Sequence, residues 1–360
     1  MKTINLEFNT MTQSGSCYVI AEIGHNHQGK LEKALEMIKV AAEYCNVQAV
    51  KFQKRNNKSL FTKKFYNHEY KSSNSYGRTY GEHREALEFG KEEYIKLMEC
   101  AKAYNVDFIV TPFDTESVDF LEEIGVSCYK IASADVTNTV LIEYIARLHK
   151  PIILSTGACT LDEIRLAYEI INQYHDKLCI LHCVASYPTE DKDTNLGFIK
   201  TLKKEFPNTI IGYSSHDLGI LAPIVANALG ATVIEKHFTL DKNLKGSDHK
   251  LSLEPDEMKQ LVENLKAATL MYGSGDKVLN EYELDARVKM GKSIYSAKPL
   301  EAGTILTLDD ITIKSPGGFL PPYEIKNILG KRLKYSLKEE EPITFEMLEV
   351  VKYDAEKVAN

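Results

Sequence analysis

Two histidines lie at the ends of two consecutive apolar segments in the middle of the chain. His216 follows residues 210–215, and His237 follows residues 232–236. If both segments are parallel strands, their carboxyl ends lie at the same edge of a sheet and the two imidazoles can meet there. A single histidine at a strand end more often forms a structural hydrogen bond. Two of them together are a candidate site for a divalent metal ion, because imidazole is a common metal ligand.

Two lysines lie at the ends of other apolar segments. Lys51 belongs to residues 49–53 and Lys130 to residues 129–133. A buried lysine is costly in free energy unless it meets an anion. Hydroxyl groups occur at or just after the ends of neighbouring segments, on Thr111, Ser133, Ser155 and Ser214. Together these groups predict a binding site for a phosphate or a carboxylate. Lys51 can instead form a structural ion pair with Glu22, and the sequence leaves both interpretations open.

Further polar residues occur at the ends of apolar segments or in the loops that follow them. Carboxylates, imidazoles and amides at such positions can bind a polar substrate or transfer protons. This set comprises Glu22, His25, Asn26, His27, Gln53, Asp135, Ser186, Tyr187, Glu235, Asp248 and His249. They form one site only if the fold brings the segment ends together.

The elements that carry these residues alternate between apolar segments and amphipathic stretches. The apolar segments are residues 17–23, 48–53, 107–111, 127–131, 151–155, 178–183, 209–213 and 232–237. Because they are continuously apolar, they predict parallel strands that are buried on both faces. Eight strand–helix units predict an α/β fold, a closed (β/α)8 TIM barrel, in which polar residues at the carboxyl ends of the strands share one site. An open doubly wound sheet is the second interpretation, and the absence of a GxGxxG or Walker-type loop disfavours it.

Two stretches interrupt this alternation. Residues 54–88 are long for a loop and rich in polar residues, which favours a lid over the carboxyl ends of the strands. Residues 272–276 are rich in turn formers, and short β-like segments follow them. We therefore predict a barrel domain over residues 1–273, a linker over residues 274–290 and a small, mostly β domain over residues 291–355.

The composition is that of an ordinary globular protein, with 44% hydrophobic and 26% charged residues. A net charge of −7 argues against nucleic acid or an anionic membrane as a partner. Any anionic ligand must therefore be held by local positive groups. Seven cysteines without CxxC spacing, and a start that lacks the apolar stretch of a signal peptide, predict a cytoplasmic protein with reduced thiols.

With these residues assembled, the chain resembles the sialic acid synthase family. The motifs that carry the resemblance lie in residues 21–29, 50–53, 111–114, 130–133, 155–157, 187–189, 212–216, 235–239, 246–249 and 252–255. In this order they are specific and extend over nearly the whole chain, and the tail looks like the family's antifreeze-like (SAF) domain. The resemblance implies condensation of phosphoenolpyruvate with N-acetylmannosamine or its 6-phosphate, giving N-acetylneuraminate (sialic acid) or its 9-phosphate. It also implies a domain-swapped homodimer, in which the tail reaches over the barrel of the partner subunit.

The resemblance implies a role for each matching residue. Mn²⁺ or Mg²⁺ is expected on His216 and His237, and imidazole ligands favour manganese. Glu22 is expected to stabilise the developing cation or to handle the water that captures it. Phosphoenolpyruvate is expected to contact Lys51, Thr111, Lys130, Ser133, Ser155 and Ser214, and the sugar Gln53, Asp135, Tyr187 and Asp248.

Three positions depart from the pattern of members that use the unphosphorylated sugar. Those members usually carry Glu where this chain has Asp135, Asn where it has Ala185, and Arg where it has Ser315. That arginine contacts the acyl group of the sugar across the dimer. The contact is therefore expected to be absent here or to pass to Lys314.

Residues 75–83 and 245–249 look closer to animal-type synthases, which use the 6-phosphate sugar. On this interpretation, Arg78 or Lys71 of the predicted lid is the candidate to bind the phosphate. The sequence leaves the phosphorylation state of the sugar open.

Three other functions remain in view. The first is a synthase for another nonulosonic acid, of the legionaminic, pseudaminic or KDN type. The second is a Schiff-base aldolase that uses Lys130 or Lys51. The third is a non-catalytic binding protein whose tail binds ice or glycans, although such a protein has no need of Glu22 beside a histidine pair.

Overall fold

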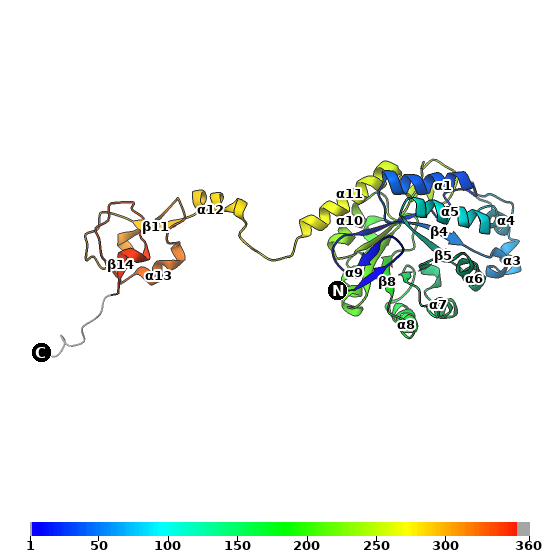
Figure 1. Ribbon diagram of the computed structural model, residues 1–360, viewed down its shortest axis with the longest axis horizontal. Helices are drawn as coiled ribbons and strands as arrows, with labels where there is room; N and C mark the ends of the chain where they lie inside the picture. Colours follow the sequence, from blue (N-terminus) through cyan, green and yellow to red (C-terminus); the bar gives the residue numbers. More distant parts are fainter. Residues whose placement is uncertain (1, 351–360) are drawn as a thin grey trace. The chain divides into compact units, whose positions relative to one another are not determined.

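Eight parallel strands form a closed barrel at the centre of the larger unit of the molecule (Figure 1). The computed structural model describes residues 2–350. The strands are β3 (Tyr18–Glu22), β4 (Ala49–Lys54), β5 (Asp107–Pro112), β6 (Tyr129–Ile131), β7 (Ile152–Ser155), β8 (Leu178–Cys183), β9 (Ile210–Ser215) and β10 (Val233–His237). They pair in chain order, and β10 closes the sheet against β3. The predicted TIM barrel is confirmed, and the open doubly wound sheet is wrong.

The register of the strands brings the polar residues to one level of the barrel. Glu22 of β3 is paired with His237 of β10 on one side and with Lys51 of β4 on the other. Across the next interfaces, Gln53 of β4 is paired with Thr111 of β5, and Ser214 of β9 is paired with Glu235 of β10. Residues that are far apart in sequence therefore meet at the carboxyl ends of the strands.

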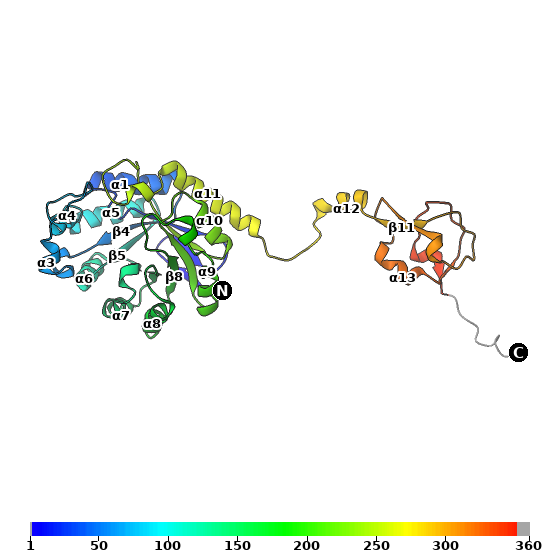
Figure 2. The ribbon, with the colours of Figure 1, turned by 180° about the vertical axis from the view of Figure 1, so that it is seen from behind.

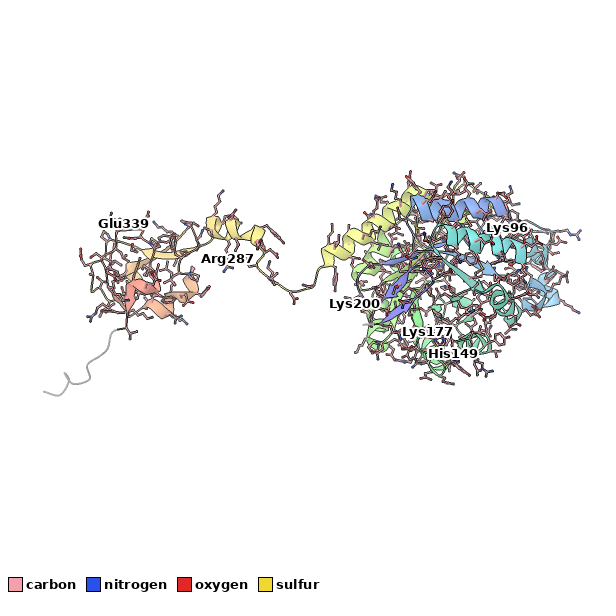
Figure 3. The ribbon with its side chains drawn as sticks, in the orientation of Figure 1. Lys96, His149, Lys177, Lys200, Arg287 and Glu339 are labelled. Atoms are coloured by element: carbon pink, nitrogen blue, oxygen red, sulfur yellow. The ribbon has the colours of Figure 1, made fainter. Side chains whose placement is uncertain are left out.

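Helices surround the barrel and bury its outer face (Figure 1). They are α1 (Leu31–Lys39), α5 (Lys91–Ala103), α6 (Thr115–Ile124), α7 (Thr139–Ala146), α8 (Leu161–Asn172), α9 (Phe198–Glu205), α10 (Leu221–Ala228) and α11 (Pro255–Tyr272). Their boundaries follow from local chemistry: Asp114 caps the amino end of α6, and Pro255 opens α11. The exposed side chains of Lys96 on α5 and Lys200 on α9 lie on the outside of this helix layer (Figure 3).

A short hairpin closes the amino end of the barrel. It consists of β1 (Thr3–Asn5) and β2 (Thr10–Thr12), which are antiparallel. Ile4 and Met11 of this hairpin are buried in the cluster of apolar residues that fills the barrel interior. This end of the barrel is therefore apolar and packed.

The segment predicted as a lid has structure of its own. Within residues 54–88 lie the short helices α2 (Asn57–Leu60), α3 (Lys63–Tyr66) and α4 (Tyr80–Glu85). A capping box formed by Thr79 and Glu82 fixes the start of α4. The lid also contacts the loop after β10, because the hydroxyl of Tyr76 donates a hydrogen bond to the carbonyl of Lys245 at 2.5 Å.

A second compact unit begins after Ser274 (Figure 2). Its elements are α12 (Leu284–Met290), β11 (Ser293–Ser296), β12 (Ile311–Lys314), α13 (Ile325–Ile328), β13 (Arg332–Leu333) and β14 (Leu348–Glu349). The strands form two antiparallel pairs around a small apolar core that includes Ile294, Ile328 and Ile343. The last residues of the predicted small domain, 351–355, lie outside the described residues.

The helices within residues 2–350 include none with both the length and the apolar character that a membrane crossing requires.

Candidate functional site

A cavity of about 620 Å³ opens at the carboxyl ends of the barrel strands. The predicted site residues that line it are Glu22, His25, Lys51, Gln53, Thr111, Lys130, Ser133, Ser155, Tyr187, Ser214, His216, Glu235, His237 and Asp248. These residues come from all eight strands or from the loops that follow them. The closed barrel is therefore what converts a scattered set of polar residues into one site.

Two lysines and two glutamates form an ion-pair network in the floor of the cavity. The ammonium of Lys51 lies 2.8 Å from Glu22 Oε2 and 3.7 Å from Glu235 Oε1. Lys130 lies 3.5 Å from the same Glu235 oxygen. Lys51 forms the predicted ion pair with Glu22 and also lines the cavity, so the structure is compatible with both the structural and the ligand-binding interpretation.

The surroundings of these groups shift their pKa values in different directions. Burial works against the charge of Glu235, but Lys130 and then Lys51 outweigh it and hold its pKa at about 2. Burial also opposes the charge of Lys51, yet Glu22 and Glu235 raise its pKa above the usual value. For Lys130, burial prevails and lowers the pKa, because Glu235 is its one close carboxylate and Lys51 repels it.

Several polar groups in the cavity lack a hydrogen-bond partner within residues 2–350. They are the hydroxyl of Ser155, Oε2 of Glu235 and Nδ1 of His237. The ammonium of Lys130 also makes no hydrogen bond in the described part of the chain, where its one polar contact is the ion pair with Glu235 at 3.5 Å. Unpartnered buried polar groups are costly. Their convergence on one cavity indicates that the cavity takes a polar ligand.

The two predicted metal ligands lie side by side. The ring centroids of His216 and His237 are 5.5 Å apart. Nδ1 of His216 lies 2.8 Å from the carbonyl oxygen of Val184 and must donate to it, which leaves Nε2 with the lone pair. Burial, followed by the neighbouring His237, lowers the pKa of His216 to about 4. His216 is therefore a neutral imidazole at pH 7, the form that binds metal ions.

A divalent ion fits these residues as a site with two protein nitrogens. His237 contributes a buried ring nitrogen that has no hydrogen-bond partner within residues 2–350. The hydrogen bond to Val184 orients the ring of His216 as metal-bound histidines usually are. No cluster of three or more His, Cys, Asp or Glu side chains within residues 2–350 has the arrangement of a metal site. Further ligands of the ion would have to be water or substrate oxygens.

Three predicted sugar-binding residues lie around the histidines and Glu22. The Tyr187 ring packs on the His216 ring with centroids 4.1 Å apart. Gln53 donates to Glu22 Oε1 at 2.6 Å. Asp248 lies on the loop after β10 and accepts a hydrogen bond from the hydroxyl of Ser247 at 2.8 Å.

Two predicted sugar-binding residues do not line the cavity. Asp135 is buried in the single turn Ser133–Asp135, where one of its oxygens accepts a hydrogen bond from Asn138 at 3.0 Å. Arg78 is exposed on the lid, and its backbone amide donates to Glu82. Ala185, in contrast, does line the cavity, at the position where the family pattern has Asn.

The structure adds cavity residues to which the sequence assigned no role. Arg55 lies immediately after β4, two residues beyond Gln53, so that strand alternation could have placed both on one face. Arg84 on α4 and Asn74 come from the lid. Their distance from the barrel cannot be read from the sequence, because it depends on how the lid folds back.

Comparison with known proteins gives a consistent result. Residues 37–277 match the NeuB family, and residues 291–349 match the SAF domain. The human N-acetylneuraminate-9-phosphate synthase is 38% identical over 335 residues, which cover 92% of this chain and 93% of the human protein. The N,N'-diacetyllegionaminic acid synthase of Legionella pneumophila is 38% identical, with 96% of this chain and 99% of that protein covered.

Two solved structures extend this comparison. N-acetylneuraminic acid (sialic acid) synthetase from Leptospira borgpetersenii, solved in complex with citrate, is 36% identical with a TM-score of 0.69, covering 79% of this chain and 95% of that one. A putative spore coat polysaccharide biosynthesis protein E from Chromobacterium violaceum is 30% identical with a TM-score of 0.79, covering 93% of this chain and all of that one (100%).

Proposed function

This chain belongs to the NeuB family, and from that premise we propose that it condenses phosphoenolpyruvate with a mannosamine-type sugar. The sugar is N-acetylmannosamine or its 6-phosphate. The products are N-acetylneuraminate or its 9-phosphate, together with inorganic phosphate. Relatives that are synthases of N-acetylneuraminate 9-phosphate and of N,N'-diacetyllegionaminic acid support the reaction type.

The observation that carries this proposal is the buried ammonium of Lys130. It lies in the cavity floor with one carboxylate at 3.5 Å and no hydrogen bond within residues 2–350. The unpartnered hydroxyl of Ser155 faces the same cavity. Together with Lys51, these donors suit a ligand with two anionic groups, as phosphoenolpyruvate has. The hydroxyls of Thr111, Ser133 and Ser214 are the remaining proposed contacts.

In the proposed reaction, C3 of phosphoenolpyruvate attacks the aldehyde carbon of the open-chain sugar. The π electrons of the enol ester form the new C–C bond, and the aldehyde oxygen takes up a proton. Positive charge develops at C2, and the Glu22 carboxylate stabilises it. Water then adds to C2 and loses a proton. The resulting intermediate releases phosphate by cleavage of its C–O bond, which leaves the 2-keto acid.

A divalent ion, Mn²⁺ or Mg²⁺, bound by His216 and His237 would orient and polarise the aldehyde. The bond of His216 to the Val184 carbonyl holds its ring in place, and the ring of Tyr187 covers one of its faces. Gln53 orients Glu22 through their hydrogen bond. Asp248 is proposed to accept hydrogen bonds from sugar hydroxyls.

Mass spectrometry of the products tests this proposal. Purified protein with Mn²⁺ and phosphoenolpyruvate would receive N-acetylmannosamine or its 6-phosphate, and a mass gain of one pyruvate unit plus release of phosphate is expected. With phosphoenolpyruvate labelled with ¹⁸O at the C2–O position, the label should leave with phosphate. Absence of product with every mannosamine-type sugar tested would overturn the proposal.

The identity of the sugar is the finer part of this proposal. Relatives that make legionaminic and pseudaminic acids share 38% and 35% identity with this chain, respectively. The same assay with 2,4-diacetamido hexoses and with mannose tests a legionaminic, pseudaminic or KDN-type product. Identity and coverage do not separate the two series, because the human and the Legionella relatives are both 38% identical and cover 92% and 96% of this chain. We favour the N-acetylmannosamine series because residues 75–83 and 245–249 resemble animal-type synthases.

A Schiff-base aldolase is favoured by one observation, the lowered pKa of Lys130. Borohydride treatment in the presence of substrate would then add the mass of the reduced adduct to the protein. We expect no such adduct, and we expect EDTA to remove the activity. A borohydride-trapped lysine in an EDTA-insensitive enzyme would favour the aldolase.

We also propose a cytoplasmic, domain-swapped homodimer. The free thiols at all seven cysteine positions fit a reducing compartment. Large apolar side chains are exposed at the end of α11 and at the start of the second unit, among them Met271 at 84% and Tyr282 at 83%. A partner subunit would cover such side chains. Analytical ultracentrifugation should give twice the mass of the chain, and a monomer at micromolar concentration would contradict this.

A further inference from the structure

Two arginines meet at one histidine in the wall of the cavity. Arg55 Nη1 lies 3.3 Å from His25 Nε2, and Arg84 Nη1 lies 3.3 Å from His25 Nδ1. All three residues line the cavity. Arg55 follows strand β4 of the barrel, whereas Arg84 lies on helix α4 of the lid.

Arg55, Arg84 and His25 together have more hydrogen-bond donors than acceptors. A neutral imidazole has one N–H and one lone pair, so it can accept a hydrogen bond from only one of the two guanidinium groups. The pKa of His25 is well below its usual value because of burial and, after that, the charges of Arg55 and Arg84. The other guanidinium group therefore directs an N–H at the ring without an acceptor. The cluster is short of acceptor atoms.

The cluster also has more positive than negative charges. Glu88 is 3.9 Å from Arg55 and is shared with Lys54 at 3.5 Å. Arg84 has no ion pair within residues 2–350, and its other hydrogen bonds go to the neutral hydroxyl of Tyr80. Within the cluster, Arg55, Arg84 and Lys54 face the carboxylate of Glu88 and, if it is counted, that of Asp248 in the cavity. Asp135 is also within electrostatic reach of Arg55, but it is buried outside the cavity with Asn138.

The position of the cluster relative to the reacting groups is defined by a chain of contacts. Lys51 is paired with Glu22, Glu22 accepts from Gln53, and Oε1 of Gln53 accepts from Arg55 at 2.8 Å. From Arg55 the contacts continue through His25 to Arg84. In this series of contacts, the two arginines lie at the end toward the lid, and Lys51 lies at the other end.

We infer that Arg55 and Arg84 bind a terminal phosphate on the sugar, so that the substrate is a hexosamine 6-phosphate. In an open-chain hexose, C6 is the carbon farthest from the C1 aldehyde that reacts. A phosphate at C6 brings the acceptor atoms and the negative charge that the cluster lacks, and planar guanidinium groups suit it. This inference rests on the proposed function. It assigns the phosphate to Arg84 in place of Arg78, whose side chain is outside the cavity.

Kinetics with paired sugars test the inference. Wild type and variants would be assayed with N-acetylmannosamine and its 6-phosphate at saturating phosphoenolpyruvate. We expect wild type to prefer the phosphorylated sugar. In Arg84→Gln, the ratio of kcat/KM for the phosphorylated over the free sugar should fall about 10- to 100-fold, the loss expected for one charge-assisted interaction. Arg84→Lys keeps the charge but loses the planar fork, so its ratio should lie between the two.

Control variants separate this site from a general effect of lid charge. Lys64→Gln removes an exposed positive charge of the lid, on α3, and should leave the ratio at the wild-type value. Arg78→Gln should do the same. Thermal unfolding and the KM for phosphoenolpyruvate should stay at wild-type values in Arg84→Gln.

The outcomes distinguish this inference from the proposed function. Absence of product from either sugar with wild type overturns the proposed function. An active wild type that does not prefer the phosphorylated sugar, or an Arg84→Gln variant with an unchanged ratio, overturns only the phosphate site. A ratio that falls in Arg78→Gln but not in Arg84→Gln also overturns it and returns the phosphate to the exposed arginine.

Discussion

The two ends of the barrel interior are built from the same strands but differ in polarity. Toward the amino end, the inward residues of successive strands are apolar, and the hairpin residues Ile4 and Met11 pack with them. For six of the eight strands, the inward residue two positions farther along, on the same face, is polar. The pairs are Ile20 and Glu22, Ala49 and Lys51, Ile109 and Thr111, Cys128 and Lys130, Ile153 and Ser155, and Val233 and Glu235.

This comparison shows how one fold separates stability from chemistry. The apolar layer is packed and removed from water, and it stabilises the closed barrel. The polar layer above it contains buried charges and unpartnered atoms, which cost folding free energy and find their use in binding a ligand. Substitutions in the polar layer should therefore reduce activity, whereas substitutions in the apolar layer should reduce the free energy of unfolding.

Glu22→Gln should give the largest loss of activity. Gln keeps the shape and can still accept from Gln53, but it has no charge to stabilise a cation. We expect kcat to fall about 10²- to 10⁴-fold, the range for removal of a charged catalytic group. The measurement is phosphate release at saturating substrates. Glu32→Gln on the exposed face of α1 is the matched control, and a Glu22→Gln variant within threefold (roughly 0.65 kcal/mol) of wild type would contradict the assignment.

His237→Ala should give the second-largest loss of activity, because it removes a proposed ligand of the metal ion. Removing one of two imidazole ligands should weaken Mn²⁺ binding by at least about 100-fold. Electron paramagnetic resonance of free Mn²⁺ measures this without relying on activity. His149→Asn is the control, because His149 is exposed beside Lys177 on the outside of the barrel, in the loop before β7 (Figure 3). Equal Mn²⁺ affinity in His237→Ala and wild type would argue against the histidine pair.

Met11→Ala should alter stability and leave the chemistry intact. Met11 is fully buried at the amino end of the barrel, so its truncation leaves a cavity. We expect the free energy of unfolding to fall by about 2–5 kcal/mol, with kcat at 25 °C close to wild type. Val140→Ala, at a position on α7 that is 72% exposed, should change stability by about 0.5 kcal/mol or less. A large loss of kcat in folded Met11→Ala would show that the two layers are coupled.

Most of the barrel could be predicted from the sequence because its signal is local. Continuous apolar segments mark parallel strands, and the polar residue that ends each one marks the carboxyl end. That is why Glu22, Lys51 and Lys130 could be named in advance. The internal structure of the lid was harder to predict. Residues 54–88 were expected to be a lid in the form of a long polar loop, whereas they contain three short helices.

The arginine cluster shows where sequence reasoning stops. Arg78 and Arg84 both lie in the lid, six residues apart, and nothing local distinguishes them. Arg84 faces the cavity because it lies on α4, whose start is fixed by the Thr79–Glu82 capping box. Arg78 lies just before that box and is exposed. The choice between them depends on a tertiary contact with His25 that only the fold supplies.

Asp135→Asn should have the smallest effect and sharpens the comparison at the edge of the polar layer. Asp135 is buried outside the cavity, where burial raises the pKa of its carboxyl group above the usual value. An amide at this position can still accept the hydrogen bond from Asn138 and does not pay for a buried charge. We therefore expect the KM for the sugar to change less than about twofold and the stability to change by at most about 1 kcal/mol. A tenfold rise in that KM would contradict this expectation and would support the sugar contact of Asp135 that the resemblance to the family implies.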